Sequence, residues 1–194
     1  YWAKILYAVR HDEAIRQAAY TWEEHCDWMT GILCGETRPE KIYHSACAAG
    51  HKALWHSEWG GLPAASVLEQ LDPYLVQVRE RYGNAPQPST VKVGTLCPEW
   101  AKKLGLKEST VISGSSFDAH AGAVGAGIQK KTFVCTMGTS CVDMFVEKPE
   151  NLKGKDIQAY CGQAENSILP GYVGVETGQA AFGDIFAWFK SLLE

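Results

Sequence analysis

The residues with the clearest chemical potential lie between Val111 and Cys141, where one carboxylate and one small polar turn are close in sequence. Asp118 follows a short apolar stretch and begins a run of small residues that we expect to form a helix. The positive end of a helix dipole favours an ionised carboxylate at this place. The turn Gly138-Thr139-Ser140 offers backbone amides and hydroxyl groups that can cradle an anion. A base and a phosphate cradle are both needed for phosphoryl transfer, because its catalysis rests on positioning and electrostatics.

Each feature also has an ordinary structural interpretation. A lone aspartate at a helix start is usually an N-cap, and a Gly-containing turn is usually a plain hairpin. The glycines of residues 122–127 follow the order G-x-x-G-x-G inside the expected helix, which excludes a dinucleotide fingerprint. His120 lies near Asp118, but neighbouring side chains on a helix point apart, so we expect no metal site there.

Two more polar groups could contact a small molecule. Lys52 lies in an unusual segment, residues 46–63, whose tryptophans could form a sugar-binding wall or simply pack a surface loop. Its other polar and aromatic members are Trp55, His56, Glu58 and Trp59. Glu176 is expected between a strand and the last helix, where a carboxylate can contact a ligand or cap the helix.

The elements that must position these groups suggest an α/β protein. Apolar spacing predicts helices in the first third, one of them opened by a capping box at residues 21–24. Buried strands are expected at residues 110–112 and 132–135, and a further strand is expected at residues 172–175. Residues 141–146 are expected to return as a hairpin around Gly138. An amphipathic helix is expected at the end of the chain, with Phe182 and Leu193 on its apolar face.

Composition excludes several classes of protein. The chain has 194 residues, enough for one large domain or parts of two, with a formal net charge of -4 and no basic stripe, so neither nucleic acid nor a membrane is an expected partner. The start at Tyr1, without a signal peptide, suggests a piece of a longer or processed polypeptide. An odd number of cysteines without a Cys-x-x-Cys pair favours buried free thiols and a cytoplasmic location. They are Cys26, Cys34, Cys47, Cys97, Cys135, Cys141 and Cys161.

Three strings carry a resemblance to a known family. They are Ser-Phe-Asp-Ala-His-Ala-Gly-Ala-Val-Gly-Ala-Gly (116–127), Met-Gly-Thr-Ser (137–140) and Val-Glu-Thr-Gly-Gln-Ala-Ala-Phe-Gly-Asp-Ile-Phe-Ala-Trp-Phe (175–189). Together they closely resemble the ribulokinase branch of the FGGY carbohydrate kinases. The resemblance implies a fragment of a two-domain, actin-like (ribonuclease H-like) sugar kinase fold, with sugar bound mainly on the first domain and MgATP mainly on the second.

The resemblance also implies roles for individual residues. Asp118 would be the catalytic base that takes the proton of the sugar hydroxyl. Lys52 and Glu176 resemble the contacts to the hydroxyls of the ketose, and Gly138, Thr139 and Ser140 would lie in the loop that holds the ATP phosphates. The implied reaction is ATP- and Mg²⁺-dependent phosphorylation of a ketopentose, L-ribulose at its 5-hydroxyl.

Several alternatives stay open. The acceptor could be xylulose, D-ribulose or glycerol, or the chain could be a non-catalytic sugar-binding relative or an actin-like ATPase. Residues 1–129 are expected to form the C-terminal part of the first, sugar-binding domain. Residues 130–194 are expected to form the N-terminal part of the second, ATP-binding domain. Because family members are far longer, this stretch alone is expected to be inactive and to need further segments or a partner chain. A homo-oligomer is left open.

Overall fold

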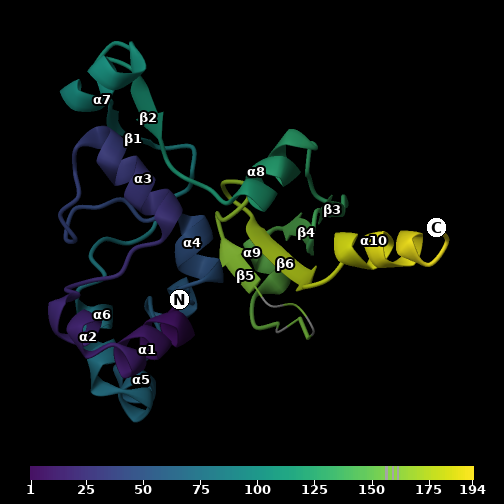
Figure 1. The fold of residues 1–194 in the computed structure, drawn as a ribbon, viewed down its shortest axis with the longest axis horizontal. Coiled ribbons are helices and arrows are strands. Elements are labelled where there is room, and N and C mark those ends of the chain that lie inside the picture. Colours follow the sequence, from purple (N-terminus) through teal and green to yellow (C-terminus); the bar gives the residue numbers. More distant parts are fainter. Residues whose placement is uncertain (156, 159, 161) are drawn as a thin grey trace.

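The computed structural model describes residues 1–155, 157–158, 160 and 162–194; Cys161, counted above among the expected free thiols, lies outside them. In this part of the chain a helical body is followed by a four-stranded antiparallel sheet (Figure 1). Several short helices build the helical body: α1 (Trp2–His11), α2 (Glu13–Ala18), α3 (His25–Cys34), α4 (Ala46–His51), the 3₁₀ turn η1 (Ser57–Trp59), α5 (Ala65–Leu71), α6 (Pro73–Glu80) and α7 (Pro98–Leu104).

The helical body has its own apolar core. Side chains of α1, α5 and α6 meet two alanines at and after α4, and Leu75 and Val78 are fully buried there. Burying apolar side chains in this way is the main force that holds short helices together. The members of this cluster are Trp2, Ile5, Val9, Ala49, Ala53, Leu62, Leu68, Tyr74, Leu75, Val78 and Tyr82.

The expected capping box is wrong. Helix α3 begins at His25, with Glu24 as an N-cap that makes no side-chain capping bond. Residues 19–24 are instead held outside a helix, because the Tyr1 hydroxyl donates to the Trp22 carbonyl and the Trp22 indole donates to Tyr74. Tertiary hydrogen bonds therefore override the local signal.

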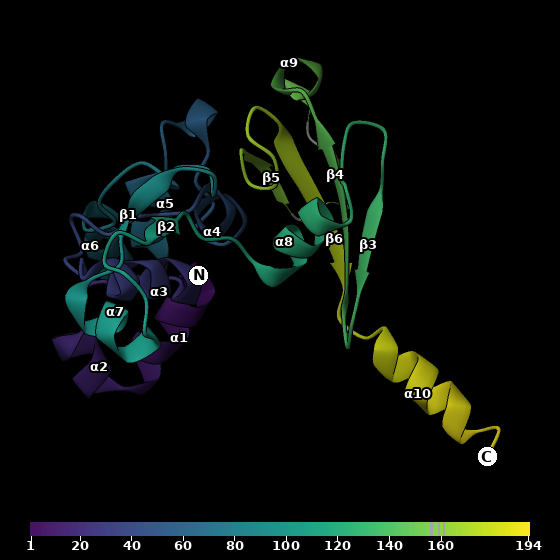
Figure 2. The same cartoon turned by 90° about the horizontal axis from the view of Figure 1, so that it is seen from above.

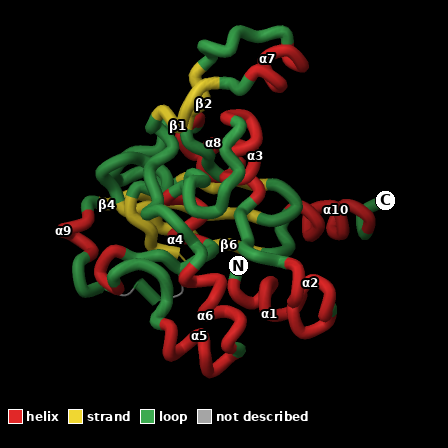
Figure 3. Tube along the Cα trace, turned by 90° about the vertical axis from the view of Figure 1, so that its left-hand side faces the viewer, coloured by secondary structure: helices red, strands yellow, loops and turns green. Residues whose placement is uncertain are grey.

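A small two-stranded sheet joins the body to the site. Strands β1 (Lys92–Thr95) and β2 (Val111–Ser113) pair antiparallel, and with α7 they project away from the larger sheet (Figure 3). The strand expected near residue 111 is present, but the expectation that it is buried is wrong, since Val111 is 56% exposed. With β1 as its paired strand in this sheet, β2 lies at the surface.

The larger sheet has the order β3-β4-β6-β5, formed by β3 (Val134–Met137), β4 (Cys141–Glu147), β5 (Gly162–Glu165) and β6 (Val173–Gln179). The expected hairpin is confirmed: β3 and β4 pair from Val134↔Met144 to Met137↔Cys141. Helix α8 (Asp118–Gly125) packs on this sheet between it and the helical body (Figure 2). The apolar core between α8 and the sheet, the second core of the described chain, contains Ala123, Ile128, Met144, Val146 and Ile168.

Two short elements complete the described chain: α9 (Pro149–Leu152) and α10 (Gly183–Ser191). Helix α10 is the expected amphipathic helix, and it extends from the end of the sheet with its apolar side chains exposed (Figure 1). Among the residues described, no helix is long and apolar enough to cross a bilayer.

Candidate functional site

The three expected sugar contacts lie on three different elements. Lys52 is the C-cap of α4, Asp118 is the first residue of α8, and Glu176 lies in the middle of β6. The expectation that Glu176 follows the strand is wrong, because β6 pairs with β4 along its whole length, from Val173↔Glu147 to Gln179↔Cys141. Glu176 is therefore held by the sheet, opposite Met144 and Gly162.

Lys52 contacts Phe117, the residue directly before Asp118. The Lys52 Nζ lies 5.0 Å from the centre of the Phe117 ring, a cation–π arrangement that brings α4 to the start of α8. Phe117 is the N-cap of α8, so the alternative in which Asp118 caps the helix is wrong. The Asp118 carboxylate is exposed and accepts a hydrogen bond from the Ala119 amide (2.8 Å). It is thus accessible to a ligand at the positive end of the helix.

The loop that precedes Asp118 is held in place by a hydrogen bond to Asp27 of α3. Asp27 is 1% exposed, and its oxygens accept from the Ser45 amide (3.1 Å) and from the Ser115 hydroxyl. Buried carboxylates are tolerated when such donors satisfy them. These bonds tie the start of α4 and the loop before α8 to the same point.

Glu176 is held by two buried histidines. Its Oε2 lies 2.7 Å from the Nε2 of His120, and its Oε1 lies 3.6 Å from the Nδ1 of His51. Burial raises the pKa of Glu176, but the hydrogen bond from His120 and the nearby positive charge of Lys52 act in the opposite direction, and the net pKa is lowered. Glu176 is therefore a carboxylate at neutral pH, and His120 Nε2 must carry the proton that it donates.

The other nitrogen of His120 then has a defined role. Its Nδ1 contacts the Sγ of Cys47 on α4. Burial raises the pKa of the Cys47 thiol to about 12, so at neutral pH Cys47 retains its proton and donates it to Nδ1. A directed chain of hydrogen bonds thus runs from Cys47 through His120 to Glu176.

His51 differs from His120. Burial lowers the pKa of His51 to about 4, which keeps the imidazole neutral at physiological pH. Among the described residues, neither ring nitrogen of His51 has a hydrogen-bond partner. The potential ligand atoms of His51, His120 and Glu176 lie within 4.8 Å of one another, so in residue type this group could hold a metal ion.

Sequence reasoning missed this cluster. It judged His120 only against Asp118 on the same helix, whereas the contacts of His120 are made to α4 and β6. The usable signal was that His51 adjoins Lys52 and that His120 follows Asp118 by two residues.

The Gly138-Thr139-Ser140 turn lies exposed at the tip of the β3–β4 hairpin. The Gly138 amide donates to the Ser140 carbonyl (2.8 Å), and the Phe182 and Gly183 amides at the start of α10 donate to the turn carbonyls. A Cβ at Gly183 would lie 2.5 Å from the Gly138 oxygen, so only glycine allows this approach. On α8, Gly122 and Gly125 have open space where a Cβ would lie. Exposed hydroxyls and an open glycine face fit the phosphates of a nucleotide.

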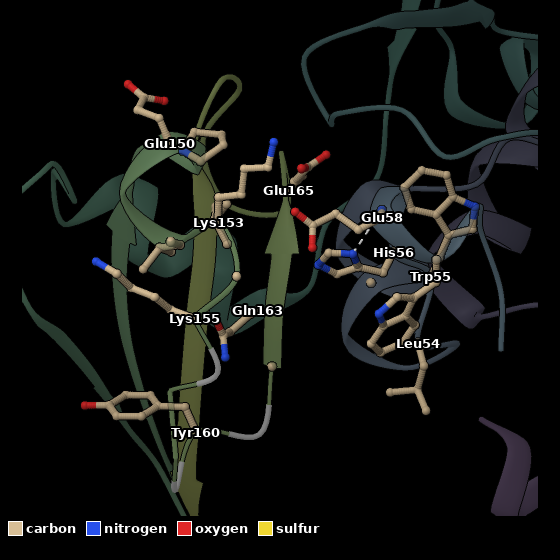
Figure 4. Close-up of a pocket in the computed structure, with 17 residues that line it drawn as sticks. Leu54, Trp55, His56, Glu58, Glu150, Lys153, Lys155, Tyr160, Gln163 and Glu165 are labelled. Atoms are coloured by element: carbon tan, nitrogen blue, oxygen red, sulfur yellow. Dashed lines mark hydrogen bonds between the residues drawn. The ribbon is translucent and has the colours of Figure 1, made fainter.

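A separate hollow of about 640 Å³ lies between residues 54–59 and the α9–β5 region (Figure 4). Trp55, Glu58 and Trp59 line it from the first of these segments, and Lys153 and Lys155 line it from the second. Its lining does not include Lys52, Asp118 or Glu176, so the hollow is distinct from the site described above. Trp55 also packs against the helical core, as the surface-loop interpretation of this segment predicts.

The fold is that of a sugar kinase. Over 99% of this chain the structure matches that of "xylulose kinase from Rhodospirillum rubrum" with a TM-score of 0.73, at 21% identity and over 36% of that chain. It also matches "Plasmodium falciparum glycerol kinase with ADP" (TM-score 0.69, 15% identity, 98% of this chain and 37% of that chain). These likenesses confirm the expected α/β sugar kinase fold.

Sequence similarity then gives the family. Residues 133–194 match the model of the C-terminal domain of the FGGY family of carbohydrate kinases. The chain is 41% identical over 193 residues to a ribulokinase of Vibrio parahaemolyticus and 33% identical over 189 residues to one of Anoxybacillus flavithermus. These matches cover 100% and 96% of this chain and 34% and 32% of the relatives. The chain belongs to the FGGY family of carbohydrate kinases, and it spans about a third of the length of these relatives.

Proposed function

We propose that this chain carries part of the active site of an ATP-dependent carbohydrate kinase that phosphorylates L-ribulose at its 5-hydroxyl in the cytoplasm. The observation that carries the proposal is the convergence of Lys52, Asp118 and Glu176 from α4, α8 and β6. A cation and two carboxylates on neighbouring elements suit a ligand rich in hydroxyl groups, because each can bind a donor or an acceptor. The ribulokinase relatives support a ketopentose as the acceptor.

In this proposal Asp118 takes the proton of the attacking hydroxyl. Its exposed position at the start of α8 leaves it accessible to the sugar hydroxyl, as a general base must be. Lys52 and Glu176 orient the sugar so that the reacting hydroxyl meets Asp118. Positioning of this kind supplies much of the rate enhancement in phosphoryl transfer.

The nucleotide side of the site would be held by Gly138, Thr139 and Ser140, whose exposed turn fits phosphate oxygens. Mg²⁺-bound ATP would supply the phosphoryl group and the positive charge that stabilises its transfer. We place the boundary between sugar-binding and nucleotide-binding domains at residues 129–130, directly before the hairpin that carries this turn.

The test is ADP release by the full-length enzyme with MgATP and L-ribulose, D-ribulose, D-xylulose, glycerol or no sugar. We expect a strong preference for L-ribulose. Preference for another acceptor would keep the mechanism and replace the substrate. ADP release that is the same with and without each sugar would contradict the proposal and favour an ATPase.

The base assignment has its own test. Asp118→Asn keeps the size of the side chain but removes the base, so we expect kcat to fall by about 10² to 10⁴. Sugar binding, measured by calorimetry, should change little. A variant with near-normal turnover would show that Asp118 is not the base.

A further inference from the structure

The three proposed sugar residues belong to, or lie close in sequence to, one cluster of packed side chains. The cluster consists of Cys47, His51, His120 and Glu176, and we call it the histidine cluster. Lys52 directly follows His51 at the end of α4, and Asp118 precedes His120 by two residues on the first turn of α8. Glu176 belongs to both sets. The histidine cluster therefore lies where the three elements of the site touch one another.

The contacts inside the histidine cluster are direct. The side chains of His51 and His120 are 0% and 1% exposed, and their ring centres lie 4.8 Å apart. Strand β5 packs closely against His51, because a Cβ at Gly162 would overlap the His51 ring. In such a dry and closely packed place a hydrogen bond to a carboxylate is strong and its geometry is fixed.

The geometry favours positioning over metal binding. His120 Nε2 and Glu176 Oε2 are 2.7 Å apart and hydrogen-bonded, so this nitrogen carries a proton and has no lone pair left for a metal ion. The second nitrogen of His120 already contacts Cys47. With both ring nitrogens engaged, His120 acts as a donor to Glu176 and not as a ligand.

We propose that His120, supported by Cys47 and His51, is a positioning residue that fixes the Glu176 carboxylate for recognition of the sugar. The inference rests on the proposed function, in which Glu176 contacts a sugar hydroxyl. With Oε2 held by His120, the carboxylate cannot rotate, so the sugar meets an acceptor that is already oriented. Because the donor is on α8 and the acceptor on β6, the same bond sets the position of Asp118 relative to the sheet.

The test compares two variants of the full-length enzyme. The amide of His120→Gln can still donate to Glu176, whereas His120→Leu cannot. We expect His120→Leu to raise the KM for the accepted sugar by about 10- to 100-fold, the effect of losing one hydrogen bond to a charged group, with the KM for ATP nearly unchanged. His120→Gln should recover most of that loss. Equal sugar KM values for the two variants would overturn the proposal.

Two controls separate positioning from general damage. Val78→Ala removes buried methyl groups in the helical core, so it lowers stability without touching the site, and its sugar KM should stay normal. In the double variant with Glu176→Gln, the effect of His120→Leu should largely disappear, because the interaction is already weakened. Full additivity of the two changes would contradict the proposal.

A spectroscopic measurement keeps the proposal separate from the proposed function. Nitrogen-15 NMR of labelled histidine should show a proton on Nε2 of His120, with its signal shifted in Glu176→Gln. An Nδ1-protonated His120 would overturn the positioning proposal even in an active ribulokinase. The expected signal in an enzyme without sugar-dependent turnover would instead leave the positioning intact and contradict the proposed function.

Discussion

At the scale of single residues, the fold holds His51 as a neutral imidazole. Its pKa is lowered from 6.5 to about 4 by burial. At pH values between these two, His51 is therefore protonated in the unfolded chain but not in the folded chain. Stability should therefore fall as pH drops from 6.5 to 4, by up to about 3 kcal/mol from this group. His51→Gln should remove that part of the pH dependence, measured as the difference in thermal midpoint between variant and parent. Exposed His11→Gln is the control, and an unchanged difference for His51→Gln across this range would contradict the assignment.

The same scale shows what sequence can and cannot give. Asp118 was placed correctly at a helix start, because a polar residue before a run of small helix formers is a local signal. The partners of His120 were not predictable in this way. They come from residues 73 and 56 positions away in the chain, and only the packing of α4 and β6 brings them together.

At the scale of elements, α4 and β5 can pack closely because each has a small residue at the contact, Gly50 on α4 and Ala164 on β5. A Cβ at Gly50 would overlap the Cβ of Ala164, so Gly50→Ala should push α4 from the sheet and destabilise the protein by about 1–3 kcal/mol. Gly122→Ala makes the same chemical change on α8, where the space is open, and should stabilise by up to about 1 kcal/mol. Urea unfolding of both variants tests the contrast. Equal changes would show that the α4–β5 contact carries no such constraint.

Elements with strong local patterns were predicted, and those that depend on neighbours were not. The β3–β4 hairpin follows from alternating apolar residues around a glycine turn. Strand β5, Gly162–Glu165, contains one apolar side chain and gives no such pattern. It is a strand because its backbone pairs with β6 and its Ala164 packs under α4.

At the scale of the whole molecule, the described chain has two separate cores. The helical cluster joins α1, α5 and α6, whereas α8 packs its Ala123 with Met144 and Val146 of the sheet. Sequence spacing indicated these apolar faces but not which face meets which. That choice depends on packing between distant segments, and here the resemblance to a family, not periodicity, pointed to the architecture.

Helix α10 leaves a large apolar surface in contact with water. Phe186 is 63% exposed, Trp188 60% and Leu193 74%, and the rest of the face is similarly open. Contiguous apolar patches of this kind drive association.

We expect the 194-residue polypeptide to self-associate, with an apparent mass that rises with concentration in sedimentation experiments. Phe186→Glu combined with Phe189→Glu should lower that mass toward the monomer, because two charges on one face of α10 repel a second copy and resist burial. Tyr7→Glu changes an equally exposed aromatic residue on α1 and should leave association unchanged. A monomer at every concentration, or equal effects of the α1 and α10 changes, would contradict the role of α10.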